Sequence, residues 1–224
     1  ARGAGLQRMG RELRRIAGGL ASVLANRVFL PLLLAYMLSW VGRTLNVSLA
    51  LYYYKTRLQL SETAIFAQVL VVFMLAIVVS IPLWVWLGRR YGKRTPAFFG
   101  ALTLGVMTFV VYPFLPIGVV GPALLTVSVV GGFAAGSIIL FDSLVPDIVD
   151  YDELRTGEHR EGLYFGCWFF VTKLARAAGL VLTGGLLSAV GYVEGAEVQA
   201  EGVAWRLSLL FGPGVGVWFI VGAL

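Results

Sequence analysis

The chain is 224 residues long, with 58% hydrophobic residues, 13% charged residues and a mean hydropathy of +0.84. Soluble domains contain about 25% charged residues, so this composition excludes a soluble globular domain and predicts an integral membrane protein. The net charge of +6 does not indicate nucleic-acid binding, because no soluble basic domain is visible to carry it. Cys167 is the single cysteine and His159 the single histidine, so we expect no intrachain disulfide, no metal site in this chain and no cofactor.

Six apolar segments follow one another along the sequence. They cover residues 28–51, 64–87, 97–115, 119–141, 162–190 and 205–224. A helix needs roughly 20 residues to cross a hydrocarbon core of about 30 Å, and these segments are close to that length. They lack the two-residue alternation of a membrane strand, and an open sheet would leave its backbone unpaired in lipid. The sequence therefore predicts an all-α membrane protein: a basic cytoplasmic linker over 1–27 and a bundle of six transmembrane helices over 28–224.

The positions of Lys and Arg predict the orientation of this bundle. Residues 1–27 and the second and fourth connections hold most of the basic side chains, whereas the opposite connections contain only Lys55, Arg57 and Arg206. Because basic residues concentrate on the cytoplasmic side, we expect a multi-pass protein of the cell (inner) membrane with both ends in the cytoplasm. The chain opens in a basic stretch and stops inside an apolar run, so we also expect a piece of a longer protein.

The second connection is a short basic turn that reads Gly88-Arg-Arg-Tyr-Gly92-Lys-Arg-Thr95-Pro96. It resembles the loop motif of the major facilitator superfamily, in which glycine permits a sharp reversal and basic residues hold the cytoplasmic ends of neighbouring helices. The match is partial, since Arg89 replaces an acidic residue and Val85 replaces the leading glycine. A generic positive-inside loop is the alternative interpretation.

The fourth connection, residues 142–161, contains seven of the twelve acidic side chains of the chain. It contains Pro-Asp147-x-x-Asp150-Tyr151-x-Glu153 and then Gly157-x-x-Arg160-Glu161-Gly162, and Lys173 follows Glu161 by twelve residues. This pattern resembles the glycoside–pentoside–hexuronide:cation symporter family, the melibiose permease-like carriers of the major facilitator superfamily. The resemblance covers essentially the whole chain, as the C-terminal half of a twelve-helix carrier.

The resemblance has consequences for partners and cofactors. It implies that the acidic connection joins the tenth and eleventh helices and that Lys173 faces the central cavity. It also implies that the carboxylates holding the coupling ion, Na⁺ or H⁺, and the main sugar-binding pair lie in the N-terminal six-helix half, which is absent from this sequence. The expected partners are that half, a small polar solute and the lipid bilayer, with no nucleic acid.

Four polar side chains inside the apolar segments are candidate contacts for the solute or the coupling site. Lys173 lies about 16 Å of helix rise from the cytoplasmic edge, so its ammonium must face water or a carboxylate, or lose its proton through desolvation. Snorkelling to the interface is the alternative. Arg176 follows one turn later on a similar face and either lines the cavity or pairs with a neighbouring helix. Arg43 and Asn46 share a face of the first helix, where they either bind a polyol or join helices.

The acidic connection itself is interpreted as a cytoplasmic gate rather than a binding site. Its charged residues can form exchangeable ion pairs that latch two halves of a carrier in one state and release them in the other; a solvated loop is the alternative. The predicted gate residues are Asp142, Asp147, Asp150, Glu153, Arg160, Glu161, Arg89, Arg90, Lys93 and Arg94. Asp142 is the exception within this set, because it lies nearest the apolar run and is placed to point into the inner vestibule.

These features predict part of a secondary active transporter that moves a sugar or related polar solute together with Na⁺ or H⁺ by alternating access. We do not expect an enzyme, because no Ser/His/Asp or Cys/His arrangement shares a face. Two alternatives remain open. The aromatic residues Trp40, Tyr52–Tyr54, Trp84, Trp86 and Trp168 also suit a lysolipid carrier of the same superfamily, and a transporter fold can serve as a non-transporting membrane sensor or scaffold.

Overall fold

The computed structural model describes residues 18–196 and 198–224. Within these ranges, six helices are long and apolar enough to cross a membrane, which confirms the predicted all-helical fold. They run over Phe29–Arg57, Glu62–Tyr91, Arg94–Phe114, Val120–Thr156, Glu161–Ala189 and Val203–Ala223. The basic linker expected over residues 1–27 falls mostly outside the described residues.

Several of these spans consist of an α-helix joined to a tighter or wider turn. In chain order the elements are α2 (Phe29–Tyr52) with a π-helical turn η1 (Tyr53–Arg57), α3 (Glu62–Ala64) with η2 (Ile65–Leu70) and α4 (Val71–Tyr91), α5 (Arg94–Val111) with η3 (Tyr112–Phe114), α6 (Val120–Thr156), α7 (Glu161–Ala189), and α8 (Val203–Leu209) with η4 (Leu210–Gly214) and α9 (Val215–Ala223). The turns η1, η2 and η4 are π-helical, a form that is rare and occurs mostly as single turns inside α-helices.

The fourth span differs most from the sequence prediction. Instead of ending at residue 141, α6 continues for 37 residues to Thr156, so most of the acidic segment is helical rather than a connection. Hydropathy marks only the part of a helix that lies in lipid, whereas helical hydrogen bonding continues into water. The helix ends at Gly157, whose φ of 70° is left-handed and whose N–H donates to the carbonyl of Glu153. Pro146 lies inside α6.

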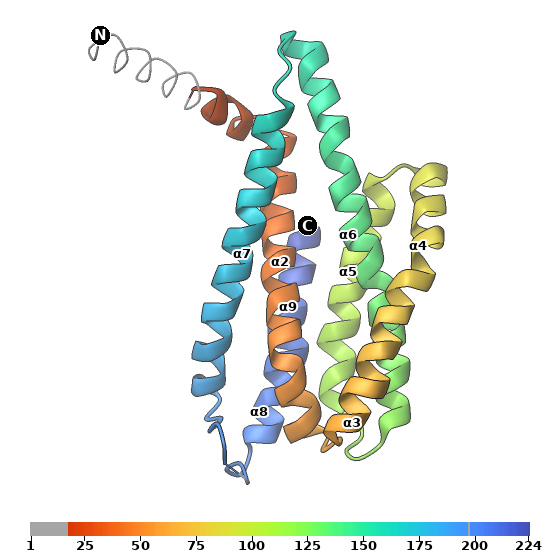
Figure 1. Ribbon diagram of the computed structural model, residues 1–224, viewed down its shortest axis with the longest axis vertical. Helices are drawn as coiled ribbons and strands as arrows, with labels where there is room; N and C mark the ends of the chain where they lie inside the picture. Colours follow the sequence, from red (N-terminus) through yellow and green to blue (C-terminus); the bar gives the residue numbers. More distant parts are fainter. Residues whose placement is uncertain (1–17, 197) are drawn as a thin grey trace, which may run out of the picture.

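The six spans form two groups of three that meet along one seam. The helices α4, α5 and α6 pack together, as do α2, α7 and α9, and α5 packs on α9 between the groups (Figure 1). Glycines make that seam close, because a Cβ on Gly216 would lie 2.8 Å from the carbonyl oxygen of Gly105. By contrast, α6 and α7 touch each other little although they are consecutive.

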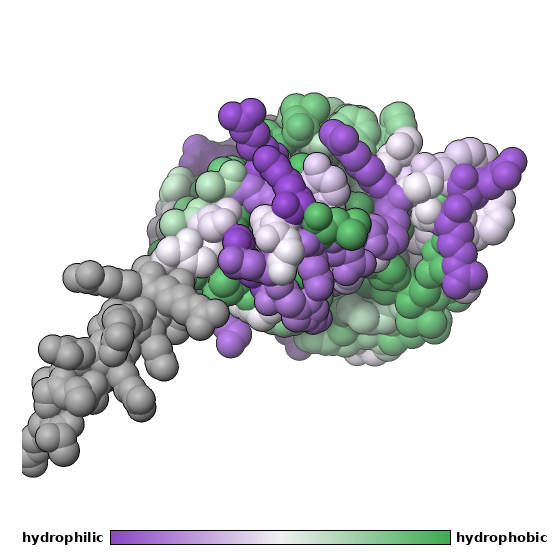
Figure 2. All heavy atoms as spheres, turned by 90° about the horizontal axis from the view of Figure 1, so that it is seen from above, coloured by the Kyte–Doolittle hydropathy of each residue, from purple (hydrophilic) through white to green (hydrophobic). Residues whose placement is uncertain are grey.

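The two ends and the flanks of the bundle differ in polarity. The end that carries the α6–α7 connection gathers hydrophilic side chains, and apolar side chains surround it (Figure 2). On the flanks, large apolar side chains are exposed, including Val79 of α4 at 75% and Val181 of α7 at 79%. Surfaces of this kind suit a lipid environment or another helical domain, as expected for a membrane-embedded half.

Candidate binding cavities

A cavity of about 710 Å³ lies between α2, α6 and α7. It is lined by Tyr36, Trp40, Asp142, Phe165, Trp168, Phe169, Thr172, Lys173 and Arg176. The weak contact between α6 and α7 leaves room for it. We call it the charged cavity, because one carboxylate and two cationic side chains share its wall. The structure thus places the predicted residues Lys173, Arg176 and Asp142 together.

Asp142 is held in the charged cavity by two aromatic donors from other helices. The hydroxyl of Tyr36 donates to Asp142 Oδ1 at 2.7 Å, and Trp168 Nε1 donates to the same oxygen at 3.0 Å. The rings of Tyr36 and Trp168 are stacked, with centroids 3.7 Å apart. Hydrogen bonds to an ionised acceptor are among the stronger ones in proteins, so this arrangement fixes the position of the carboxylate.

The two cations of the charged cavity come from one face of α7. Arg176 places its Cζ 4.1 Å from the ring centroid of Trp40, a cation–π contact with α2. Lys173 lies nearly one turn earlier and is exposed to the cavity. Among the residues that the structure describes, no ion pair joins Asp142 to either cation. The cavity therefore presents negative and positive groups that are not paired with each other.

Arg43 lines neither cavity, and most of its guanidinium group is buried against neighbouring helices. Its Nη2 donates to Ser137 Oγ of α6 at 2.9 Å, and its Cζ lies 5.5 Å from the ring centroid of Trp40. Its Nε and Nη1 are buried and have no hydrogen-bond partner among the described residues. Arg43 thus links α2 to α6, and it retains donors that a ligand, water or another helix can satisfy.

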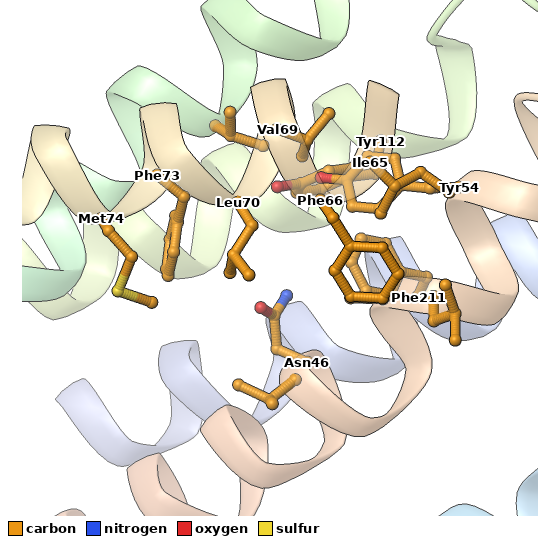
Figure 3. Close-up of a pocket in the computed structure, with 14 residues that line it drawn as sticks. Asn46, Tyr54, Ile65, Phe66, Val69, Leu70, Phe73, Met74, Tyr112 and Phe211 are labelled. Atoms are coloured by element: carbon orange, nitrogen blue, oxygen red, sulfur yellow. The ribbon is translucent and has the colours of Figure 1, made fainter. Parts of the chain in front are cut away.

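A second, smaller cavity of about 260 Å³ lies between α2 and the η2–α4 segment (Figure 3). Asn46 points into it, and its Nδ2 is buried without a partner among the described residues. Most of the remaining wall is aliphatic or aromatic, with Phe66, Leu70 and Met74 on one side. We call it the apolar cavity. Arg43 and Asn46, expected to line one site together, are therefore not brought into the same cavity.

The predicted gate residues separate into several local pairs at the hydrophilic end. Lys93 Nζ lies 2.7 Å from both carboxylate oxygens of Asp147 and donates to the carbonyl oxygen of Ser143 at 2.9 Å. These contacts tie the α4–α5 turn to α6. No ion pair of Asp150, Arg89, Arg90 or Arg94 is present among the described residues.

The α6–α7 connection is held by a second group of charges. His159 Nδ1 lies 2.7 Å from Glu153 Oε2, and its Nε2 lies 3.4 Å from Glu161 Oε2. The hydrogen bond to Glu153 is the main cause of a raised His159 pKa. Arg160 pairs with Glu158 at 2.8 Å and donates to Ser22 Oγ at 2.7 Å. Within the acidic segment, Glu153 thus pairs with His159, and Arg160 pairs with Glu158.

Sequence reasoning named Trp40 and Trp168 only as aromatic residues that suit a lysolipid carrier, and it did not assign any aromatic residue to the charged cavity. Tyr36 and Trp40 are four residues apart and so share a face of α2, and Trp168 and Thr172 have the same spacing on α7. That spacing was the available signal. It marks a shared face, but it does not say which helix faces which, and the contact between Tyr36 and Asp142 joins residues 106 positions apart.

Six lipid-length helices, three of which line a charged and aromatic cavity, define a multi-pass membrane protein with the architecture of a transporter half. Comparison with known proteins agrees. The family described as "MFS/sugar transport protein" matches residues 10–224, and the chain belongs to this family.

The curated relatives of the chain are transporters. It is 29% identical over 197 residues to the sodium-dependent lysophosphatidylcholine symporter 1-A of Danio rerio, covering 86% of this chain and 36% of that protein. It is 29% identical over 211 residues to an uncharacterized symporter of Synechocystis sp., covering 89% and 37%. It is 33% identical over 149 residues to the sphingosine-1-phosphate transporter MFSD2B of Mus musculus, covering 65% and 29%. The chain thus spans about a third of the length of these relatives.

Proposed function

We propose that this chain is the C-terminal six-helix half of a secondary active transporter, and not an enzyme, which moves a polar organic solute together with Na⁺ or H⁺. One observation carries the proposal: Lys173, Arg176 and Asp142 lie on one cavity inside a bundle of lipid-length helices. Charged side chains in membrane spans are costly and characteristic of transport pathways. The family, described as MFS/sugar transport, and the symporters among the relatives support the same class.

In this proposal the charged cavity forms one wall of the solute pathway. Lys173 donates hydrogen bonds to an oxygen of a sugar or related polar solute, and Arg176 lines the same wall while held on Trp40. The carboxylates that bind the coupling ion belong to the missing six-helix half, with which this chain would enclose the solute. No cofactor is required, because ion binding and rocking of two halves supply the whole cycle.

The orientation follows from charge. Both ends of the chain are placed on the cytoplasmic side of the cell membrane, because Lys and Arg concentrate at the end that holds the α6–α7 connection. At this end the Lys93–Asp147 pair and the ion pairs of the α6–α7 connection would act as cytoplasmic gate elements. Exchange of such pairs is a common way for carriers to stabilise alternate states.

Uptake by the full-length parent protein in proteoliposomes tests this function. We expect uptake of labelled sugar to depend on a Na⁺ or pH gradient, and Lys173→Ala to abolish the gradient-driven part. Lys55→Met, at the opposite end of the bundle, is the matched control. If Lys173→Ala leaves the gradient-driven uptake unchanged, the role of Lys173 is contradicted. If uptake is independent of both the Na⁺ gradient and the pH gradient, symport is contradicted.

A lysolipid is the second candidate cargo, favoured by the apolar cavity and by the relatives that carry lysolipids. Trp40 of the charged cavity and Asn46 of the apolar cavity are six residues apart on α2, which is about 9 Å of helix rise. The two side chains point in different directions around α2, because six residues turn a helix by about 600°. In this proposal a single-chain lipid therefore bends around α2, with its head in the charged cavity and part of its chain in the apolar cavity.

Filling the apolar cavity distinguishes the two cargoes. Val47 lines this cavity and is 71% exposed, so Val47→Trp should reduce lysolipid uptake and leave sugar uptake unchanged. Leu180→Trp is the control, since Leu180 is exposed on α7 and outside both cavities. If the full-length protein takes up neither cargo, a non-transporting sensor or scaffold becomes the better assignment.

A further inference from the structure

Among the described residues, Asp142 is the one acidic residue that lines the charged cavity. The function proposed above assigns no role to it. Its sequence position made it the exception among the predicted gate residues, nearest the apolar run and placed to point into the inner vestibule. In the structure it lies against α2 and α7, next to Tyr36 and Trp168. Asp142 is exposed to the cavity rather than buried. A solute that displaces water from the cavity must therefore supply a partner for the carboxylate, because an ionised carboxylate without water is unfavourable unless it is paired.

The hydrogen bonds of Asp142 leave half of the carboxylate available. Tyr36 and Trp168 both donate to Oδ1, at 2.7 Å and 3.0 Å. Among the described residues, Oδ2 accepts no hydrogen bond and joins no ion pair. Asp142 is thus fixed in position by one oxygen while the other can accept from a ligand, which is the arrangement of a preorganised binding group.

The surroundings of this carboxylate favour a positive charge. Tyr36, Trp168, Phe165 and Phe169 contribute aromatic rings to the same cavity. Aromatic faces attract cations, and several rings around one site recognise organic ammonium groups. One aromatic face, that of Trp40, is already in contact with the Arg176 guanidinium at 4.1 Å, which shows that rings of this cavity accept a cation.

The opposite wall of the cavity carries the reverse charge. Lys173 and Arg176 belong to α7, Asp142 belongs to α6, and no ion pair connects them in the described part of the chain. A neutral sugar would leave all three charges without a counter-charge. A solute with one negative and one positive group would give both Lys173 and Asp142 an opposite charge within a space of about 710 Å³.

We propose that Asp142, held by Tyr36 and Trp168, is a specificity-determining carboxylate that binds an ammonium group of the cargo. Lys173 then takes the anionic group, so the cavity selects dipolar solutes over neutral sugars and over simple anions. This inference rests on the proposed transport function. It gives Asp142 and Lys173 different roles, since Asp142 binds the ammonium group of the cargo and Lys173 binds its anionic group. Tyr36 acts as a positioning residue.

Calorimetric titration of the purified full-length parent protein tests the proposal with three probes: phosphocholine, glycerol phosphate and glucose. We expect phosphocholine to bind about tenfold or more tighter than the other two. Asp142→Asn, which keeps the size of the side chain, should remove that preference and strengthen glycerol phosphate binding, because it removes a negative charge. Tyr36→Phe should weaken phosphocholine to a smaller extent. Glu201→Gln, an exposed acid of the α7–α8 connection outside both cavities, should change none of the three affinities.

The outcomes separate this inference from the proposed function. Equal binding of the three probes by the wild type, no binding of any of them, or an unchanged preference in Asp142→Asn would overturn the assignment of Asp142. An equal loss of all three affinities in Asp142→Asn, with an unaltered thermal unfolding temperature, would also overturn it. If binding follows the expected pattern but neither a Na⁺ gradient nor a pH gradient drives uptake, the transport proposal fails and the assignment of the carboxylate stands.

Discussion

Arg176 of α7 stacks its guanidinium on the indole of Trp40 in α2, with 4.1 Å between Cζ and the ring centroid. Lys173, on the same wall of the cavity, has no corresponding contact with an aromatic ring among the described residues. The two cations of α7 are therefore not equivalent. Arg176 attaches α7 to α2, and Lys173 keeps its ammonium available to the cavity.

Replacing Arg176 should affect stability more than transport. A cation–π contact contributes about 0.5–2 kcal/mol, depending on how far it is desolvated. We expect Arg176→Gln to lower the thermal unfolding temperature in detergent, and Arg176→Lys to restore part of it, with gradient-driven uptake retained in both. Trp40→Leu should lower the unfolding temperature similarly. Loss of uptake in Arg176→Lys without a loss of stability would show that Arg176 contacts the cargo.

Close packing between α5 and α9 should make Gly216 intolerant of a side chain. A Cβ there would lie 2.8 Å from the carbonyl oxygen of Gly105 and 2.8 Å from the Cβ of Phe109, so backbone would have to move. Overpacking of this kind costs about 1–3 kcal/mol. Gly216→Ala should therefore unfold at a lower temperature than the wild type, whereas Gly184→Ala, with nothing within 4 Å, should not. Equal effects of the two substitutions would contradict this packing.

The ion pair between Lys93 and Asp147 should be measurable but modest. Their side chains are 36% and 52% exposed, and exposed pairs contribute about 0.2–1 kcal/mol. A double-mutant cycle with Lys93→Met and Asp147→Asn, read by thermal unfolding, should give a coupling free energy in that range that falls with added salt. Arg94→Met with Asp147→Asn is the matched cycle and should show no coupling.

A pH titration tests the His159 cluster between α6 and α7. The hydrogen bond to Glu153, and then the charges of Glu153 and Glu161, raise the His159 pKa in the folded protein. Folding therefore favours the imidazolium. Its stabilising contribution is complete below the unfolded pKa of about 6.5 and is lost as the pH rises through the raised folded pKa.

The comparison to make is between the wild type and His159→Gln. Thermal unfolding should show the wild type gaining stability over the variant at about pH 6, and the difference should vanish at about pH 9. Glu153→Gln should lower the His159 pKa, measured by NMR of selectively labelled histidine. A difference between the two proteins that grows with pH would mean that His159 is held as the neutral base.

The fold was predictable from sequence because the hydropathy of each segment predicts whether that segment spans the membrane, without knowledge of the other segments. The Lys and Arg content of each connection likewise predicts the orientation. The site was only partly predictable. Lys173 was found because a cation in a long apolar run is conspicuous. The partners of Asp142 depend on how α2 and α7 pack, which no local pattern records, so the sequence indicated only that it is the gate residue nearest the apolar run and the inner vestibule. Likewise, helical spacing put Arg43 and Asn46 on one face, but that face borders two different environments.

The uninterrupted length of α6 connects the charged cavity to the hydrophilic end of the bundle. Its 37 residues extend about 55 Å, well beyond a hydrocarbon core of about 30 Å. Pro146 has no N–H for the carbonyl of Asp142, so the helix bends most easily between the cavity carboxylate and the Asp147–Lys93 pair. A ligand that shifts Asp142 would thus bend α6 at Pro146 and displace the segment that follows it. Because Asp147 lies in that segment, occupancy of the cavity would change the geometry of the Lys93–Asp147 ion pair.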